Sequence, residues 1–174
     1  PGLFAARIAG MARRYGANVI EINAPLGEAV PNQRITEELA RNPNTRLVAV
    51  VHAETSTGVC HPVAELGDAM RGSDALLLAD CVTSLCGIEL EPARRGADYC
   101  YSCSQKCLGA PPGISLVSLS PRAMERIESP PTPVPLRVSF ARPAQVLVAR
   151  PATPHPPPHN ITKLHPPGQR LLPP

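Results

Sequence analysis

Apolar and polar residues alternate along the first 128 residues with two different periods, one helical and one typical of strands. Residues 3–15 place their apolar side chains on one helical face and their arginines largely opposite, which predicts an amphipathic helix ending at Gly16. The helical period returns over 35–41, 63–71 and 124–127. Short apolar runs between these segments predict strands at 18–22, 46–51, 75–79, 98–101 and 114–118.

Helices and strands therefore follow one another with short connections. This order favours an α/β fold with a mostly parallel sheet and flanking helices. Ligands of such sheets bind beyond the carboxyl ends of the strands. Three polar segments, 52–58, 80–84 and 102–106, directly follow predicted strands. We therefore expect a functional site where these three segments meet.

Proline and acidic residues divide the chain near residue 128. All 14 acidic residues lie at or before Glu128, whereas 14 of the 23 prolines lie between 130 and 174. We interpret 1–128 as a globular, partial domain and 129–174 as a Pro-rich tail that is disordered or non-native. The net charge of +3 comes from the tail. The globular part thus lacks the basic surface typical of nucleic-acid binding.

The chain begins with Pro1-Gly2 rather than Met, which indicates a fragment. It contains no apolar run long enough to span a membrane and no signal-peptide pattern. All six cysteines lie between Cys60 and Cys107, unlike the spread of a secreted disulfide framework. We therefore expect reduced thiols and an intracellular protein without membrane association.

The polar segments contain the groups that pyridoxal phosphate (PLP) chemistry requires. An amine must join the aldehyde of PLP as a Schiff base, and a carboxylate must face its pyridine nitrogen. Lys106 and Asp80 can supply these two groups, Thr55 can bond the ring oxygen, and Ser104 or Gln105 can bond the phosphate. Each residue also has an ordinary explanation, because a lysine after a strand is usually a solvated charge and an aspartate there often caps a turn.

His52 follows the strand predicted at 46–51. Its side chain can cap the end of that strand or stack on a cofactor ring. Taken alone, the structural role is the more common one. We nevertheless keep His52 among the candidate cofactor-binding residues.

The segment 52–120 resembles class V aminotransferases of the alanine–glyoxylate and serine–pyruvate type, and the resemblance extends over roughly 1–135. It rests on His-Ala-Glu-Thr-Ser-Thr-Gly-Val at 52–59, Ala-Asp-Cys-Val-Thr-Ser-Leu at 79–85, Tyr-Ser-Cys-Ser-Gln-Lys at 101–106 and Ala-Pro-Pro-Gly at 110–113. The last two runs are highly specific for this family.

The resemblance implies part of the large domain of a fold type I PLP-dependent transferase. Lys106 would carry PLP, Asp80 would pair with the pyridine nitrogen, Thr55 would lie near the ring hydroxyl and Gln105 would contribute to the phosphate site. It further implies a homodimer that moves an amino group from alanine or serine to glyoxylate or pyruvate. Family members occur in the cytosol, peroxisomes and mitochondria, which leaves the compartment open.

Some positions depart from the family pattern. Cys86 and Cys103 replace residues that are usually glycine, and we expect a strained backbone if position 103 needs a positive φ. The segments that carry the Gly-rich phosphate turn and the substrate-binding arginine have no counterpart here. We expect the fragment alone to be inactive.

Three alternatives stay open. Cys100, Cys103 and Cys107 have a spacing that thiolate metal sites use, although a fourth ligand is not evident. The prolines of the tail can dock on aromatic grooves, so an inactive fragment could serve only as a binding module. Another class V enzyme is the third alternative, of the cysteine desulfurase or aminoethylphosphonate aminotransferase type.

Overall fold

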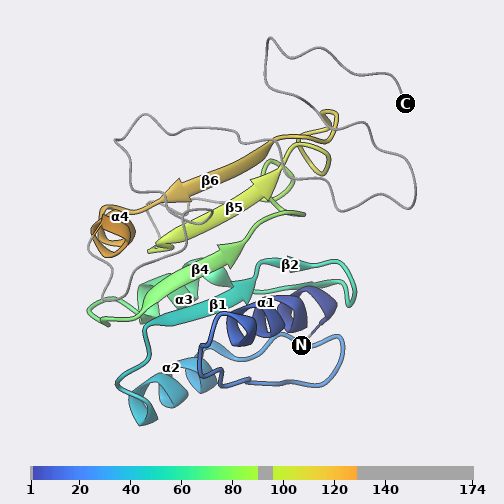
Figure 1. Ribbon diagram of the computed structural model, residues 1–174. Helices are drawn as coiled ribbons and strands as arrows, with labels where there is room; N and C mark the ends of the chain where they lie inside the picture. The colour runs from blue at the N-terminus through green and yellow to red at the C-terminus, as the bar shows by residue number, and fades with distance from the viewer. Residues whose placement is uncertain (1, 90–95, 129–174) are drawn as a thin grey trace.

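The computed structural model describes residues 2–89 and 96–128, and the predicted tail lies outside these residues (Figure 1). Its elements, in chain order, are α1 Leu3–Arg14, α2 Asn32–Arg41, β1 Leu47–Val51, β2 Ala53–Glu54, β3 Val59–Cys60, α3 Val63–Ala69, β4 Leu76–Asp80, β5 Tyr99–Cys103, β6 Ser115–Leu119 and α4 Pro121–Glu128.

Four strands form one sheet in the order β1-β4-β5-β6. The strands β1, β4 and β5 run parallel, and β6 runs antiparallel to β5 at the edge. This arrangement confirms the predicted α/β fold with a mostly parallel sheet. The register aligns Val51 with Asp80 and Asp80 with Tyr101, so the ends of β1 and β4 lie side by side next to β5.

The core lies between the sheet and α3. The central strand β4 is almost entirely buried, in keeping with its run of leucines. From α3 and the residue after it, Val63, Leu66 and Met70 pack in the same cluster as Leu77 and Ala79 of the strand. Burying such side chains contributes about 1.5–3 kcal/mol each. The strand is thereby held firmly, with Asp80 at its carboxyl end.

The prediction of a strand at 18–22 is wrong for this chain. These residues follow α1 in an irregular path and belong to neither sheet. An extended segment becomes a strand only when a neighbour accepts and donates its ladder hydrogen bonds, and no described strand does so here. The apolar pattern identified an extended segment but could not supply its partner.

The segment after β1 contains two short strands that the sequence did not predict. β2 and β3 form an antiparallel hairpin, with Gly58 at positive φ in its turn. Only two residues form each strand of this hairpin, which is too short for a recognisable alternating pattern. The hairpin presents the 52–58 segment as an ordered unit.

Candidate functional site

The three polar segments meet at the carboxyl edge of β1, β4 and β5, as the sequence predicted. The segment after β4 links the other two. Thr83 donates its hydroxyl to the carbonyl oxygen of Ala53 at 2.6 Å, and the Cys107 thiol donates to the Thr83 carbonyl oxygen at 3.3 Å. These bonds bring the 52–58 and 103–109 segments to opposite sides of one loop.

His52 lies inside this junction. Its side chain is buried, and its Nδ1 lies 2.9 Å from the Ser84 hydroxyl oxygen. Its backbone N–H donates to the carbonyl oxygen of Asp80. The histidine therefore joins two of the segments. This geometry agrees with the structural role considered for His52 and leaves ring stacking as a prediction.

Asp80 is the buried carboxylate of the site. One oxygen, Oδ2, accepts the Tyr101 hydroxyl at 2.6 Å, and the other, Oδ1, accepts the Val82 backbone N–H at 3.0 Å. Burial, together with the bond to this carboxylate, raises the pKa of Tyr101 above its usual value. Each oxygen of Asp80 still has a lone pair available for a further donor.

Lys106 and Gln105 are exposed in the turn after β5. The turn is closed by the Gly109 N–H, which donates to the Lys106 carbonyl oxygen at 2.9 Å. No hydrogen bond or ion pair joins the Lys106 amine to another residue of the described ranges. The amine is thus free to react with a ligand at the strand ends.

Ser104 has a different place in the same turn. It is buried, its hydroxyl donates to the Pro111 carbonyl oxygen at 2.6 Å, and its oxygen accepts the Ile114 N–H at 3.4 Å. The one proton of the hydroxyl is used within the turn. Of the two residues predicted to bond a phosphate, Gln105 is therefore the one with free donors.

Thr55 is exposed at the hairpin turn, and its hydroxyl lies 3.4 Å from that of Thr83. This long contact leaves the Thr55 hydroxyl able to bond a ligand. The five predicted positions beside Lys106 thus divide into two groups. Asp80, Thr55 and Gln105 keep free hydrogen-bonding capacity at the edge of the sheet, whereas His52 and Ser104 hold the segments together.

No role is predicted for Glu54 or Tyr101 from the sequence patterns. The Glu54 carboxylate is buried and accepts the N–H groups of Phe4 and Ala5 at the start of α1, as well as the hydroxyl and N–H of Ser56. Burial by itself raises its pKa, but the four hydrogen bonds outweigh burial and lower it. Both residues stand in the quoted motifs, yet only their contacts show what they bind.

Cys86 and Cys103 differ in backbone conformation. Cys86 has φ of 68°, and Cys103 is an ordinary residue of β5. The positive φ that would have strained position 103 is therefore found at position 86 and not at position 103. Among the described residues, no three His, Cys, Asp or Glu side chains gather as a metal site, so the proposed thiolate cluster is not formed there.

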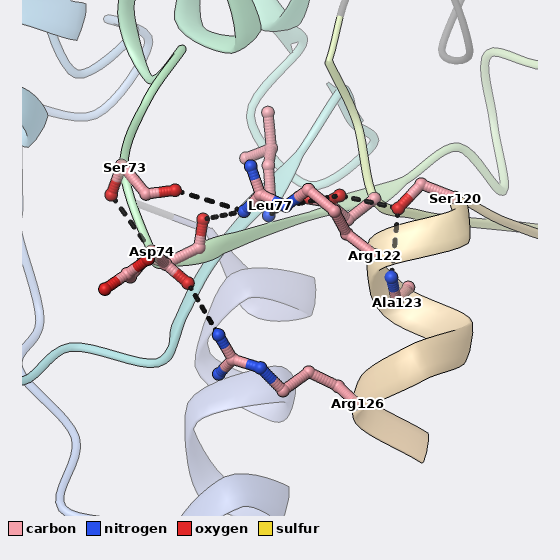
Figure 2. Close-up of polar contacts among 9 residues, drawn as sticks. Ser73, Asp74, Leu77, Ser120, Arg122, Ala123 and Arg126 are labelled. Carbon is pink, nitrogen blue, oxygen red and sulfur yellow. Dashed lines mark hydrogen bonds and ion pairs between the residues drawn. The ribbon is translucent and has the colours of Figure 1, made fainter. Parts of the chain in front are cut away.

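A separate cavity of about 610 Å³ lies at the opposite end of β4. Here Arg122 of α4 donates to the carbonyl oxygens of Ser73 and Ala75, and Arg126 donates to that of Asp74 (Figure 2). These contacts brace α4 against the segment that enters β4. Because Leu76 of this cavity begins the strand that Asp80 ends, the cavity is distinct from the candidate site.

The donor set at the carboxyl edge fits PLP. The groups that bind its aldehyde, ring nitrogen and oxygens are present: an amine without a partner among the described residues, a buried carboxylate with free lone pairs, and two exposed polar side chains.

Within residues 2–89 and 96–128, no helix combines the length and apolar character needed to cross a bilayer.

Comparison with known proteins points the same way. The chain is 39% identical over 128 residues to mouse alanine–glyoxylate aminotransferase, covering 74% of the chain and 31% of that enzyme. It is 32% identical over 120 residues to pyridoxamine–pyruvate transaminase of Mesorhizobium japonicum, covering 69% of the chain and 30% of that enzyme. The chain spans less than half the length of these relatives.

Solved structures share the fold. The crystal structure of alanine–glyoxylate aminotransferase from Nostoc sp. superposes with a TM-score of 0.72 at 41% identity, covering 76% of this chain and 35% of that one. The family model described as aminotransferase class-V matches residues 5–134. The chain therefore belongs to the class V aminotransferases, a family of PLP-dependent enzymes with the fold type I architecture.

Proposed function

We propose that this chain forms the PLP-binding part of an aminotransferase that moves an amino group from alanine or serine to glyoxylate or pyruvate. The observation that supports it most is the placement of Asp80 at the carboxyl end of β4 and of Lys106 just after the carboxyl end of the adjacent parallel strand β5. An amine and a carboxylate in these places can bind the aldehyde and the pyridine nitrogen of one PLP molecule.

The names of the relatives favour glyoxylate as the acceptor. Besides the alanine–glyoxylate enzymes, they include an L-aspartate–glyoxylate aminotransferase of Paracoccus denitrificans and an (S)-ureidoglycine–glyoxylate transaminase of Bacillus subtilis. In these names the amino donors differ while glyoxylate recurs, and the pyridoxamine–pyruvate transaminase names pyruvate instead. We therefore regard glyoxylate as the first acceptor to assay, and alanine or serine as the first donors.

PLP, when bound, supplies an aldehyde for the amine and a ring that draws electrons from the reacting carbon. The Lys106 amine would hold the cofactor and would carry a proton between the substrate α-carbon and the cofactor. Asp80 would pair with the pyridine nitrogen and favour its protonated form. Thr55 would bond the ring hydroxyl, and Gln105 would bond the phosphate.

We propose that the remaining residues of the PLP and substrate pocket come from parts of the whole protein outside this chain. Because the chain spans about a third of its relatives, we place the substrate-carboxylate site outside it. We further propose that the whole protein is an intracellular homodimer. The six free cysteines agree with a reducing compartment.

Two lysines, Lys106 and Lys163, are the only ones in the sequence, which makes a clean comparison possible. PLP binding to the 174-residue chain is measured by absorbance and equilibrium dialysis for the parent, Lys106→Ala and Lys163→Ala. We expect Lys106→Ala to lose the covalent absorbance band and Lys163→Ala to keep it. Equal bands in both variants would refute the assignment of Lys106.

A cysteine desulfurase is the second candidate within the same cofactor class. A desulfurase structure from Thermococcus onnurineus shares the fold at 22% identity, which supports the fold alone. Such an enzyme needs a reactive cysteine beyond the lysine, and Cys107 is the last cysteine of the chain. Sulfide release from cysteine by the whole protein would favour this candidate, whereas glyoxylate-dependent loss of alanine would favour the transaminase.

A further inference from the structure

A second residue contacts the carboxylate that we assign to the pyridine nitrogen. The Tyr101 hydroxyl donates to Asp80 Oδ2 at 2.6 Å, a length typical of a hydrogen bond to an ionised carboxylate. The sheet fixes this contact, because Asp80 and Tyr101 are register partners on β4 and β5. The tyrosine reaches the aspartate without leaving its strand.

We propose that Tyr101 is the positioning residue of Asp80, holding its carboxylate in the orientation that binds the pyridine nitrogen of PLP. This inference rests on the proposed function. Two donors act on the carboxylate from different sides, since the Val82 N–H binds Oδ1 while the tyrosine binds Oδ2. Together they prevent its rotation and leave a free lone pair on each oxygen for the cofactor.

The hydroxyl stays a donor over the working range of pH. Burial, and next the bond to Asp80, raise the pKa of Tyr101, so the proton remains on the phenol oxygen. Tyr101 is half-buried, and Asp80 is 6% exposed. Water therefore competes poorly for the Asp80 carboxylate. The hydrogen bond from the fixed Tyr101 hydroxyl is stronger in this buried place than it would be in water.

The same strand offers a matched control. Tyr99 lies two residues before Tyr101, on the same face of β5, and is also half-buried. Its hydroxyl makes no bond to Asp80. Tyr99→Phe thus removes a hydroxyl from the same face of β5, near Asp98 and Arg126, without touching Asp80.

The experiment compares PLP binding by the 174-residue parent, Tyr101→Phe and Tyr99→Phe. Equilibrium dialysis gives the affinity, and nitrogen-15 NMR of ring-labelled PLP gives the pH at which the bound pyridine nitrogen loses its proton. For Tyr101→Phe we expect PLP affinity to fall about tenfold, the change that loss of a hydrogen bond to a charged group produces, and the pH midpoint to fall as well. Tyr99→Phe should stay within about twofold of the parent.

A second variant covers the case in which Tyr101→Phe does not fold. Replacing Tyr101 by 3,5-difluorotyrosine keeps the shape of the side chain, but its hydroxyl ionises at far lower pH. Raising the pH then removes the donor from a folded chain. We expect PLP affinity to fall with that ionisation at position 101, and not when the same residue stands at position 99.

The outcomes separate the inference from the function on which it rests. A parent that binds PLP through Lys106, with Tyr101→Phe matching Tyr99→Phe in both readouts, would overturn the role of Tyr101 alone. A rise of the pH midpoint in Tyr101→Phe would also overturn it. The tyrosine would then weaken the interaction of Asp80 with the protonated pyridine nitrogen instead of positioning the carboxylate for it. A parent without covalent PLP would overturn the proposed function and this inference together.

Discussion

The Glu54 carboxylate accepts the backbone N–H of Phe4 at 3.1 Å, across fifty residues of sequence. The same oxygen accepts the N–H of Ala5. Gly2 allows this approach, because a Cβ at that position would lie 2.3 Å from Glu54 Cγ. An acidic side chain of the hairpin thereby caps the first turn of α1 and interacts favourably with the helix dipole.

Replacing Glu54 should weaken this cap. For Glu54→Gln we expect the free energy of unfolding to fall by about 1 kcal/mol at pH 7, the usual value for losing a charged helix cap. Urea denaturation followed by circular dichroism measures it. Glu28→Gln is the control, because Glu28 is exposed and its side chain forms no hydrogen bond or ion pair within the described residues.

The pH dependence of the same variant has a defined sign. Because the folded pKa of Glu54 is lowered from 4.5, its contribution is present above that value and is lost as pH falls through the folded pKa. Between pH 5 and pH 3 the parent should therefore lose more stability than Glu54→Gln. If the unfolding free energies of the parent and Glu54→Gln fell in parallel with pH, this would contradict the capping role of Glu54.

His61 should produce a separate pH effect. Burial, followed by the nearby charge of His52, lowers the pKa of His61 from 6.5 to about 4. Between these two values the unfolded chain binds a proton at His61 that the folded chain does not bind. The free energy of unfolding therefore falls as pH drops from 6.5 toward 4. We expect a slope of about 1 kcal/mol per pH unit, measured by urea denaturation.

The variant His61→Gln removes this proton-binding group while keeping a polar side chain of similar length. Its stability should change less than that of the parent over the same range. Since Nε2 of His61 has no hydrogen-bond partner among residues 2–89 and 96–128, the substitution breaks no bond of that atom there. An unchanged slope in His61→Gln would show that another group causes the pH effect.

Replacing Cys86 by glycine should stabilise the folded protein. Its φ of 68° lies in the left-handed region, which costs a non-glycine residue about 1–2 kcal/mol. The side chain is exposed, so little packing is lost. After the entropy cost of glycine, we expect Cys86→Gly to raise the unfolding free energy by about 0.5–1 kcal/mol.

Cys103→Gly is the matched substitution at the other departure from the family pattern. Cys103 ends β5 with an ordinary strand conformation, so glycine there should lower the unfolding free energy by about 0.5–1 kcal/mol. Thermal unfolding of both variants checks the pair. Stabilisation at position 103, or destabilisation at position 86, would be inconsistent with the backbone geometry.

Sequence patterns predicted the central strands and the meeting of three polar segments at their carboxyl edge, because local periodicity and strand direction decide both. They did not predict the irregular path at 18–22, because strand formation depends on a partner outside the segment. They also left open whether Cys103 is strained, since a missing glycine does not reveal which position has positive φ. The roles of Glu54 and Tyr101 follow from contacts between distant segments, and no local pattern encodes them.

The most direct test of the account locates PLP on the chain. The 174-residue protein is incubated with PLP, reduced with borohydride to fix any covalent adduct, digested and analysed by mass spectrometry. We predict that the added mass resides on the peptide containing Lys106 and that Lys106→Ala lacks it. Added mass on Lys163, or on no peptide, would contradict the assignment of Lys106 as the cofactor lysine.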